Sequence, residues 1–534
     1  MCEITSDNFY SELPVIEAAI NESSFISIDM EFSKIDDIIY QPFSYFDIPK
    51  ERYSLLRKKV SDITCIQFGL SIFTYDITKK TFNTRAYSIY TFPQTFCKSN
   101  SEVHFQISCM EFLNRHKFDF NKLFSRGVPY LTDEQEIMIK LEMSDDLFFE
   151  NYFENTSRFI KVKIELDKIL KIISTWYDNA KYGETQFFKT NECSESACII
   201  LMQYYLLKNY KNILIHEVKS GLNITKVKQI NDVDLLNNSL YKKNLKQSLF
   251  DNMMGIKYLL KLLFKLKKPL IGHNCSLDLL ILCNQFFEPL PENFKDFQIF
   301  VSRNFGPIYD TKLLCKELKR VIPKNYNWKG NSLPEIYSFL TNGDGRRIPI
   351  LINIELSGIK EPQETKFHDA GWDAYYTGYC FIRIVHIIKC MSNKRETDFQ
   401  TFNFTEFLKI VEPFKNKFYT QRSITNFIDL KTDSHENQIN YLIIQNKGMF
   451  YKSLDVNKLT SRLKEVCAFD IKLLSNYTAL IVSPCRNKRI IDGLKSEYMV
   501  DEYSDYQRRR KNQYIVGLSL MICTPIIILL YLKK

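Results

Sequence analysis

Residues 25–33 read FISIDMEFS, and this stretch decides the fold. Its apolar and hydroxyl residues are typical of a buried β-strand. Two acids, Asp29 and Glu31, stand near its end, and residues two apart on a strand project from the same face. A pair of solvated acids at a strand terminus is one reading. A divalent cation is the other, because its charge would relieve the repulsion that otherwise raises both pKa values.

Two further acids lie on apolar elements far along the chain. Asp278 belongs to PLIGHNCSLDLL (269–280), where it falls on the first turn of a predicted helix after a short strand. Asp373 belongs to HDAGWDAYYTG (368–378), five residues after His368. An acid on an apolar helix needs a partner. We therefore expect Asp278 and Asp373 to point inward, with His368 on the loop ahead of its helix.

These segments together indicate two-metal hydrolysis of a phosphodiester. In that chemistry carboxylates hold two ions about 3.5 to 4 Å apart, and a general base takes the proton of the attacking water. Magnesium suits oxygen ligands, and manganese can substitute for it. A capping or packing histidine is the alternative reading of His368. The predicted set has His368 as general base and four metal ligands, Asp29, Glu31, Asp278 and Asp373.

The composition narrows the class of protein. The 534 residues, 45% of them hydrophobic, are enough for two to four folded units. A net charge of +10 is compatible with a polyanionic partner and equally with an ordinary lysine-rich protein. The 14 cysteines include no CxxC pair and no cluster of zinc spacing, and the N-terminus has no secretory pattern. Both features favour a reducing compartment.

The chain pattern predicts an α/β architecture with additions. Predicted helix 7–21, strand 25–32 and strands within 62–76 and 84–93 open the chain, and a helix, strand, helix pattern resumes from 246. The region between them is rich in Lys and Asn and does not continue this pattern. We expect a catalytic domain split into 1–150 and 246–392, an inserted small domain over 151–245, and an α+β domain resembling an RNA-recognition motif over 399–505.

The C-terminus predicts a membrane anchor. Residues 514–532 read YIVGLSLMICTPIIILLYL without a charge, and basic residues flank them on both sides. A helix of this length would span about 28 Å, close to the thickness of a bilayer core. A buried core helix is the alternative. The basic residues before the span predict a single-pass tail anchor with residues 1–507 in the cytosol.

The motifs resemble a known family of nucleases. DMEF (29–32), GHNCSLD (272–278) and HDAGWD (368–373) are similar to the three exonuclease motifs of the DEDD superfamily, and the His-x4-Asp spacing resembles its DEDDh branch. With YSIYTFPQTF, FDFNKLFSRGVPYL and IYDTKLL, the chain resembles the poly(A)-specific ribonuclease group of the CAF nuclease family. The resemblance covers residues 1–150 and 246–392, about half of the chain.

This resemblance implies a ribonuclease H-like fold and magnesium-dependent 3′-to-5′ exonuclease activity on single-stranded RNA ends. It carries the five catalytic-type residues over in the roles already given. Lys312, in IYDTKLL, matches a lysine that contacts the RNA backbone. Phe32 is placed to stack on or wedge beside the terminal base, as aromatic residues do in single-strand channels. Residues 151–245 lack the Arg-x3-His motif that names the family's small nucleic-acid-binding domain.

The predicted anchor selects a branch of the family. With it the chain resembles the PARN-like domain-containing, Trimmer branch, which shortens the 3′ ends of PIWI-interacting RNA precursors. That likeness implies a PIWI protein and a Tudor/KH adaptor as partners. It also implies the cytosolic face of an intracellular membrane, with the mitochondrial outer membrane favoured over the endoplasmic reticulum. The alternatives are a general poly(A) deadenylase of mRNA and an inactive RNA-binding membrane scaffold. The complete set of catalytic-type residues argues against the scaffold.

Overall fold

The computed structural model divides the described residues into two compact units. One unit holds most of the chain up to Phe418, and the other combines residues 43–55 with the described residues from Tyr419 onward. The structure describes residues 1–35, 43–93, 102–145, 147–149, 159–189, 196–210, 212–218, 221–228, 232–348, 353–357, 366–392, 404–424, 427–431, 441–447, 453–485, 487–509 and 511.

A mixed β-sheet forms the centre of the first unit. Its strands follow the order β1-β4-β3-β2-β8-β9-β11, with β10 beside β4. The central strand β2 is antiparallel to β3 and parallel to β8. The strand predicted over 25–32 is confirmed. The bounds are β1 (Cys2–Ile4), β2 (Phe25–Phe32), β3 (Cys65–Asp76), β4 (Thr81–Tyr90), β8 (Leu270–Gly272), β9 (Ile308–Asp310), β10 (Asn353–Leu356) and β11 (Lys417–Tyr419).

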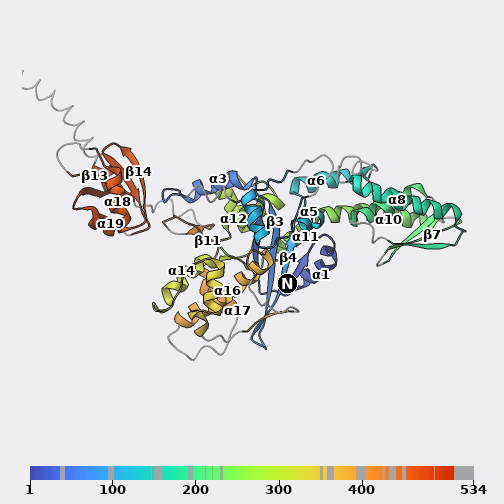
Figure 1. Cartoon of the computed structure of the whole chain (residues 1–534), viewed down its shortest axis with the longest axis horizontal. Helices are drawn as coiled ribbons and strands as arrows, with labels where there is room; N and C mark the ends of the chain where they lie inside the picture. Colours follow the sequence, from blue (N-terminus) through green and yellow to red (C-terminus); the bar gives the residue numbers. More distant parts are fainter. Residues whose placement is uncertain are drawn as a thin grey trace, which may run out of the picture. The chain divides into compact units, whose positions relative to one another are not determined.

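Helices pack on this sheet and make the first unit an α/β fold, as predicted. The long helix α16 (Ala370–Ser392) packs across β2, β3 and β4 (Figure 1). Its aromatic stripe, with Trp372 and Phe381, joins Phe25 and Phe73 of the sheet in one buried core. The other helices of this unit's α/β part are α1 (Phe9–Glu22), α4 (Ile107–Arg115), α5 (Phe120–Arg126), α6 (Asp133–Glu142), α11 (Ile256–Leu266), α12 (Ser276–Phe286), α13 (Phe294–Asn304), α14 (Thr311–Val321), α15 (Leu333–Thr341) and α17 (Phe404–Val411).

Gly69 of β3 lets the start of α16 approach the central strands. A Cβ built at Gly69 would lie 1.8 Å from the carbonyl oxygen of Ala370, so only glycine fits here. Gln67, two residues away on the same strand, accepts a hydrogen bond from the Ala370 N–H at 3.0 Å. Gly69 pairs with Asp29 in the sheet, and Gln67 pairs with Glu31. The contact therefore places the first turn of α16 beside the acidic end of β2.

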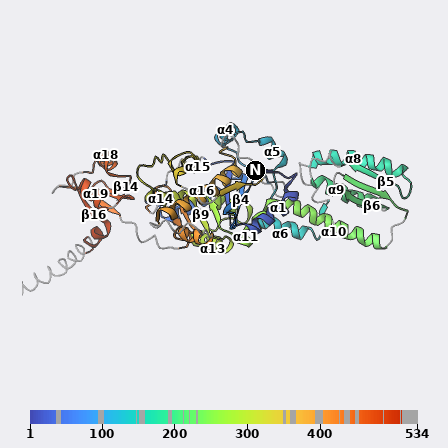
Figure 2. The same ribbon diagram turned by 90° about the horizontal axis from the view of Figure 1, so that it is seen from below.

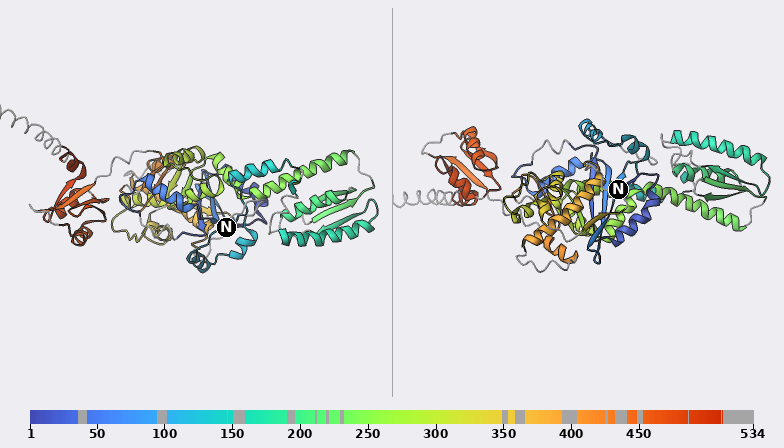
Figure 3. Two further views of the ribbon diagram at one scale, coloured as in Figure 1. Left: turned by 90° about the horizontal axis from the view of Figure 1, so that it is seen from above. Right: turned by 60° about the horizontal axis from the view of Figure 1, so that its bottom comes forward.

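The segment between the two halves of this α/β part has a sheet of its own. Its strands form an antiparallel sheet in the order β5-β7-β6. Figures 2 and 3 show these strands between α8 on one side and α10 on the other. The domain boundaries predicted at 150 and 246 stay predictions. The elements are α8 (Phe159–Asn179), β5 (Thr185–Lys189), α9 (Ser196–Asn209), β6 (Ile213–Val218), β7 (Gly221–Lys226) and α10 (Asp232–Met254).

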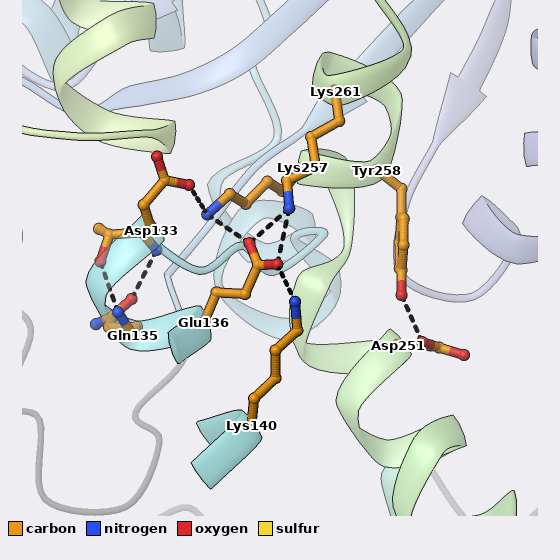
Figure 4. A network of polar contacts seen from close by, with 9 residues as sticks. Asp133, Gln135, Glu136, Lys140, Asp251, Lys257, Tyr258 and Lys261 are labelled. Carbon is orange, nitrogen blue, oxygen red and sulfur yellow. Dashed lines mark hydrogen bonds and ion pairs between the residues drawn. The ribbon is translucent and has the colours of Figure 1, made fainter. Parts of the chain in front are cut away.

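A buried ion cluster ties α11, which follows α10, to α6 (Figure 4). The fully buried ammonium of Lys257 lies 2.6 Å from Asp133 and 3.0 Å from Glu136. Burial alone would raise the pKa of Glu136, but hydrogen bonds from Lys140, Lys261 and Lys257 outweigh it and lower this pKa to about 2. Glu136 is therefore a charged partner for the buried lysine throughout the physiological pH range.

The second unit contains a small antiparallel sheet with helices on one face. Its strands follow the order β14-β15-β13-β16, and α18 and α19 share its core. Residues 43–55 belong to this unit, although in the sequence they lie within the segment 1–150 that was predicted to be catalytic. The buried Arg52 donates to Thr420 Oγ1 at 2.7 Å and to the Gln421 carbonyl at 2.6 Å. The elements are α18 (Val456–Val466), α19 (Asn487–Leu494), β13 (Leu442–Asn446), β14 (Asp470–Ser475), β15 (Thr478–Val482) and β16 (Tyr498–Glu502).

The predictions of a transmembrane helix and a tail-anchored localisation are corrected. Within the described ranges, no helix has both the length and the apolarity that a bilayer crossing requires. The long helix α16, for example, carries Asp373, Arg383 and Lys389, and charges within a span are costly in hydrocarbon. Residues 514–532 lie outside the described residues.

The contact at Gly69 leads to the first testable prediction. We expect Gly69→Ala to destabilise the chain by about 1 to 3 kcal/mol or more, because the added methyl meets the backbone of α16 and neither element can move freely. Urea unfolding measures this loss. Gly183→Ala is the matched control: its methyl would meet no atom within 4 Å, so it costs only the left-handed backbone penalty of about 1 kcal/mol. Equal losses in the two variants would contradict the close-approach role of Gly69.

Candidate active site

The end of β2 presents two carboxylates on one face. Asp29 and Glu31 are two residues apart in the ladder with β3, and both are partly buried. The register of this ladder shifts directly after Glu31, between Glu31 and Phe32. The regular strand therefore ends at the second acid, and both acids lie at the edge where the sheet gives way to loops.

The start of α16 supplies the third carboxylate, Asp373, and the histidine, His368. Asp369 precedes the helix and accepts hydrogen bonds from the N–H groups of Gly371 and Trp372, at 3.1 and 3.3 Å. His368 adopts a left-handed backbone conformation, with φ of 65°. Its N–H donates to Asp373 Oδ2 at 2.9 Å, which links the loop to the first turn of the helix. This turn brings His368 back over Asp373.

The fourth carboxylate, Asp278, comes from the helix that follows β8. Asp278 lies in the first turn of α12 and is buried. Asp310, at the end of the neighbouring strand β9, accepts hydrogen bonds from the N–H groups of Asn274 and Lys312, both at 2.9 Å. Asp310 thereby connects the turn that leads to Asp278 with the start of α14.

The structure brings these segments together although they are hundreds of residues apart. One side-chain ligand atom from each of Glu31, His368 and Asp373 lies within 4.8 Å of the other two. The charges of Asp373, Asp278 and Glu31 all act on Asp29. Glu31, His368 and Asp373 therefore form one cluster, and Asp278 and Asp29 lie near enough for their charges to act on each other, while the roles of all five residues stay predictions.

Burial and mutual repulsion perturb the pKa values of the whole cluster. Burial, reinforced by the charge of Asp373, raises the pKa values of Asp29 and Glu31 well above their ordinary range. Burial raises the pKa of Asp278 to about 7, with a contribution from Asp310. It also raises the pKa of Asp373 to about 7, and Asp369 adds to this effect. Four acids in this state need a positive partner to be charged together at neutral pH.

The donor set fits a divalent cation. Within the described ranges, Asp373 Oδ1 is buried and has no hydrogen-bond partner, which leaves a carboxylate oxygen available for a ligand. The surrounding donors are carboxylate oxygens, the ligands that magnesium and manganese prefer. A cation would also remove the repulsion that raises the pKa values. The residues present therefore suit the predicted metal.

The two predicted substrate contacts lie at the borders of the cluster. Lys312 is in the first turn of α14 and is half-buried, and burial lowers its pKa. Phe32 ends β2 directly after Glu31 and is partly exposed. Lys312 donates its backbone N–H to Asp310, and Phe32 is the residue next to Glu31 in the chain. Their contacts with RNA stay predictions.

The sequence did not point to the neighbours of His368 on α4. The rings of Phe112 and His116 lie 4.7 and 4.2 Å from the His368 ring, centroid to centroid. Burial lowers the pKa of His368, and the charge of His116 adds to this effect. The spacing of Phe112 and His116 is that of an ordinary helix surface, and nothing in it indicates a partner some 250 residues away.

An α/β sheet whose central strand ends in a cluster of four acids and a histidine is typical of a nuclease. The comparisons with known proteins show which one. The sequence model of the CAF1 family ribonuclease matches residues 4–381, which span the acidic cluster and most of the α/β part. The chain belongs to this family. It is an enzyme, a 3′-to-5′ exoribonuclease.

Relatives from several organisms extend the match beyond this region. The "Pre-piRNA 3'-exonuclease trimmer" of Bombyx mori is 27% identical over 96% of this chain and 93% of its own length. The "Poly(A)-specific ribonuclease PARN" of Homo sapiens is 25% identical over 96% of this chain and 81% of its own. The solved structure of S. pombe Pop2p, a Mg²⁺ and Mn²⁺ bound form, is 16% identical over 72% of this chain and 91% of that one, with a TM-score of 0.33.

The raised pKa values predict how metal and pH act on stability. Asp278 and Asp373 have a pKa of about 7 in the folded chain and near 4 when unfolded. Between these values the folded chain binds more protons, so the free energy of unfolding of the metal-free protein falls as pH rises from about 4 to 7. Magnesium competes with these protons. We therefore expect a larger increase in Tm on adding Mg²⁺ at pH 8 than at pH 6.

Scanning calorimetry with EDTA or with Mg²⁺ measures this difference. The variant Asp278→Asn with Asp373→Asn should show a small Mg²⁺ effect at both pH values, because the two proposed ligands with a pKa of about 7 are gone. A Mg²⁺ effect of the same size at pH 6 and pH 8 in the native chain would contradict the coupling of metal and protons.

Proposed function

We propose that this chain trims the 3′ ends of PIWI-interacting RNA precursors by two-metal-ion hydrolysis. The cluster of Glu31, His368 and Asp373 within 4.8 Å is the observation that carries the chemistry. The near full-length match to the Bombyx mori relative, whose name states the substrate, supports the choice of RNA. In this proposal the RNA is presented by a PIWI protein, and a Tudor/KH protein serves as adaptor.

In the proposed reaction the chain holds the metal and orients the substrate. Asp29, Glu31, Asp278 and Asp373 are the proposed ligands. Two divalent ions, when bound, lower the pKa of the attacking water and stabilise charge on the leaving 3′ oxygen. Water attacks the last phosphodiester, the bond from phosphorus to the 3′ oxygen breaks, and the terminal nucleotide leaves as a 5′-monophosphate. The shortened RNA ends in a new 3′ hydroxyl.

His368 is the proposed general base. Burial lowers its pKa, so the imidazole is neutral at physiological pH and can accept the proton of the water on a ring nitrogen. Its backbone hydrogen bond to Asp373 keeps it beside a proposed metal ligand. The proposed proton acceptor and one proposed metal ligand therefore belong to one hydrogen-bonded segment at the start of α16.

Lys312 and Phe32 are the proposed contacts to the RNA strand. The lysine ammonium near Asp310 is suited to the phosphate backbone, while the partly exposed ring of Phe32 is suited to stack on the terminal base. Neither contact selects a base sequence, because phosphates carry none and every base has a stacking face. This is consistent with trimming of RNA of mixed sequence.

Deadenylation of mRNA is the second candidate function. The match to the human poly(A)-specific ribonuclease covers 96% of this chain and is the observation that favours it. The two functions share the chemistry of the site and differ in the RNA that is shortened. Substrate preference separates them.

The catalytic role of the acids gives the next prediction. We expect Glu31→Gln to lower exonuclease activity at least about 100-fold, the scale on which one preorganised electrostatic group acts. The amide keeps the size of the side chain, so circular dichroism should be unchanged. Denaturing gels of 5′-labelled RNA, with Mg²⁺ or with EDTA, measure shortening from the 3′ end. Glu134→Gln, at an exposed position of α6, is the matched control with full activity.

Retained cleavage in Glu31→Gln, or cleavage by the native chain in EDTA, would contradict the proposed chemistry. A second pair of RNAs tests the substrate. Equal rates on oligo(A) and mixed-sequence tails, with faster shortening of a PIWI-bound precursor, are expected for a trimming enzyme. Strong preference for oligo(A) without any partner would instead identify a deadenylase.

A further inference from the structure

Helix α4 connects two segments of the catalytic cluster that are distant in sequence. At its start, the Gln106 N–H donates to the Ser33 carbonyl at 2.9 Å, and Gln106 Oε1 accepts from the Ile35 N–H at 3.2 Å. Ser33 and Ile35 directly follow Glu31 and Phe32. The N-terminal end of α4 is therefore hydrogen-bonded to the segment that follows the catalytic strand.

The other end of α4 contacts the proposed general base. Phe112 and His116, one helical turn apart, lie together with ring centroids 4.6 Å apart. The His368 ring meets Phe112 edge to face, at 4.7 Å and 77°, and lies tilted against His116, at 4.2 Å and 57°. The imidazole thus packs against a surface made by Phe112 of α4 and by His116, the residue that caps the C-terminus of this helix.

The backbone conformation of His368 explains why its ring needs a contact of this kind. The left-handed region is unfavourable for a residue with a side chain, so its φ of 65° persists only where surrounding contacts hold it. The hydrogen bond from its N–H to Asp373 fixes the backbone but leaves rotation about the side-chain bonds open. A general base must be held within a few tenths of an ångström of the proton that it accepts.

We propose that Phe112 and His116 are positioning residues that hold the His368 imidazole toward the attacking water. This inference rests on the proposed function of His368 as general base. Phe112 and His116 themselves take no proton and hold no metal. Contacts between aromatic rings are strong enough to favour one orientation of the ring by about twofold to about tenfold.

The test is a double-mutant cycle on kcat with 5′-labelled RNA and saturating Mg²⁺. We expect His116→Ala to lower kcat about tenfold with KM nearly unchanged, because chemistry loses its oriented base while RNA binding does not change. In the His368→Ala background, His116→Ala should have no further effect. A residue that acts only through His368 has nothing left to position there.

His116→Phe distinguishes positioning from proton transfer. A phenyl ring keeps the packing surface but cannot carry a proton, so we expect kcat within about threefold of the native value. Ile107→Ala is the matched control on the same helix, since Ile107 is 74% exposed at the opposite end, and its kcat should be native. An unchanged Tm in all variants confirms that α4 remains folded.

Three results would overturn the proposal. Loss of activity in His116→Phe equal to that in His116→Ala would assign a proton-carrying role to the imidazole. A rise in KM with native kcat would make the ring pair a surface for the RNA base. An equal loss with and without His368 would show that His116 does not act through it. Absence of metal-dependent cleavage in the native chain would refute the proposed function itself, before any variant is compared.

Discussion

The mutual repulsion of four acids, two of them buried and two partly buried, is the interaction on which the site depends. Asp29 and Glu31 share one face of β2, and Asp278 and Asp373 reach the same place from two helices. Burial and like charges raise all four pKa values, so the metal-free cluster is a region of stored unfavourable energy. The surrounding fold must hold the acids together until a cation compensates their charge. Residues that suit metal binding are therefore locally destabilising in the metal-free chain.

The fold meets this demand through close backbone contact. Gly69 lets α16 start directly on β3, opposite Asp29, and the side chain of Gln67 caps the same approach with a hydrogen bond. Behind this contact, the aromatic core of α16 anchors the helix across three strands. A Cβ at position 69 would meet the backbone of this helix two to three residues before Asp373. The precision of the site is thus set by the packing of backbone on backbone rather than by the acids themselves.

Much of this arrangement is predictable from the sequence because its signals are local. The strand 25–32 and the helix with Asp373 have clear apolar patterns. An acid within such a pattern stands out as a residue that needs a partner. Contacts between distant segments have no such signal. The packing of His116 on His368 and the inclusion of residues 43–55 in the second unit, through Arg52, depend on how the chain folds back. The tail-anchor prediction rested on an apolar run and its basic flanks, and no helix among the described residues has the length and apolarity that a bilayer crossing requires.

The central claim is that the four acids form one metal site. Crystals of the full chain grown with Mn²⁺, with anomalous diffraction recorded at an energy sensitive to manganese, test it most directly. We expect two anomalous peaks about 3.5 to 4 Å apart among the carboxylates of Asp29, Glu31, Asp278 and Asp373. Full occupancy of Mn²⁺ at other positions, with no peak among these carboxylates, would contradict it.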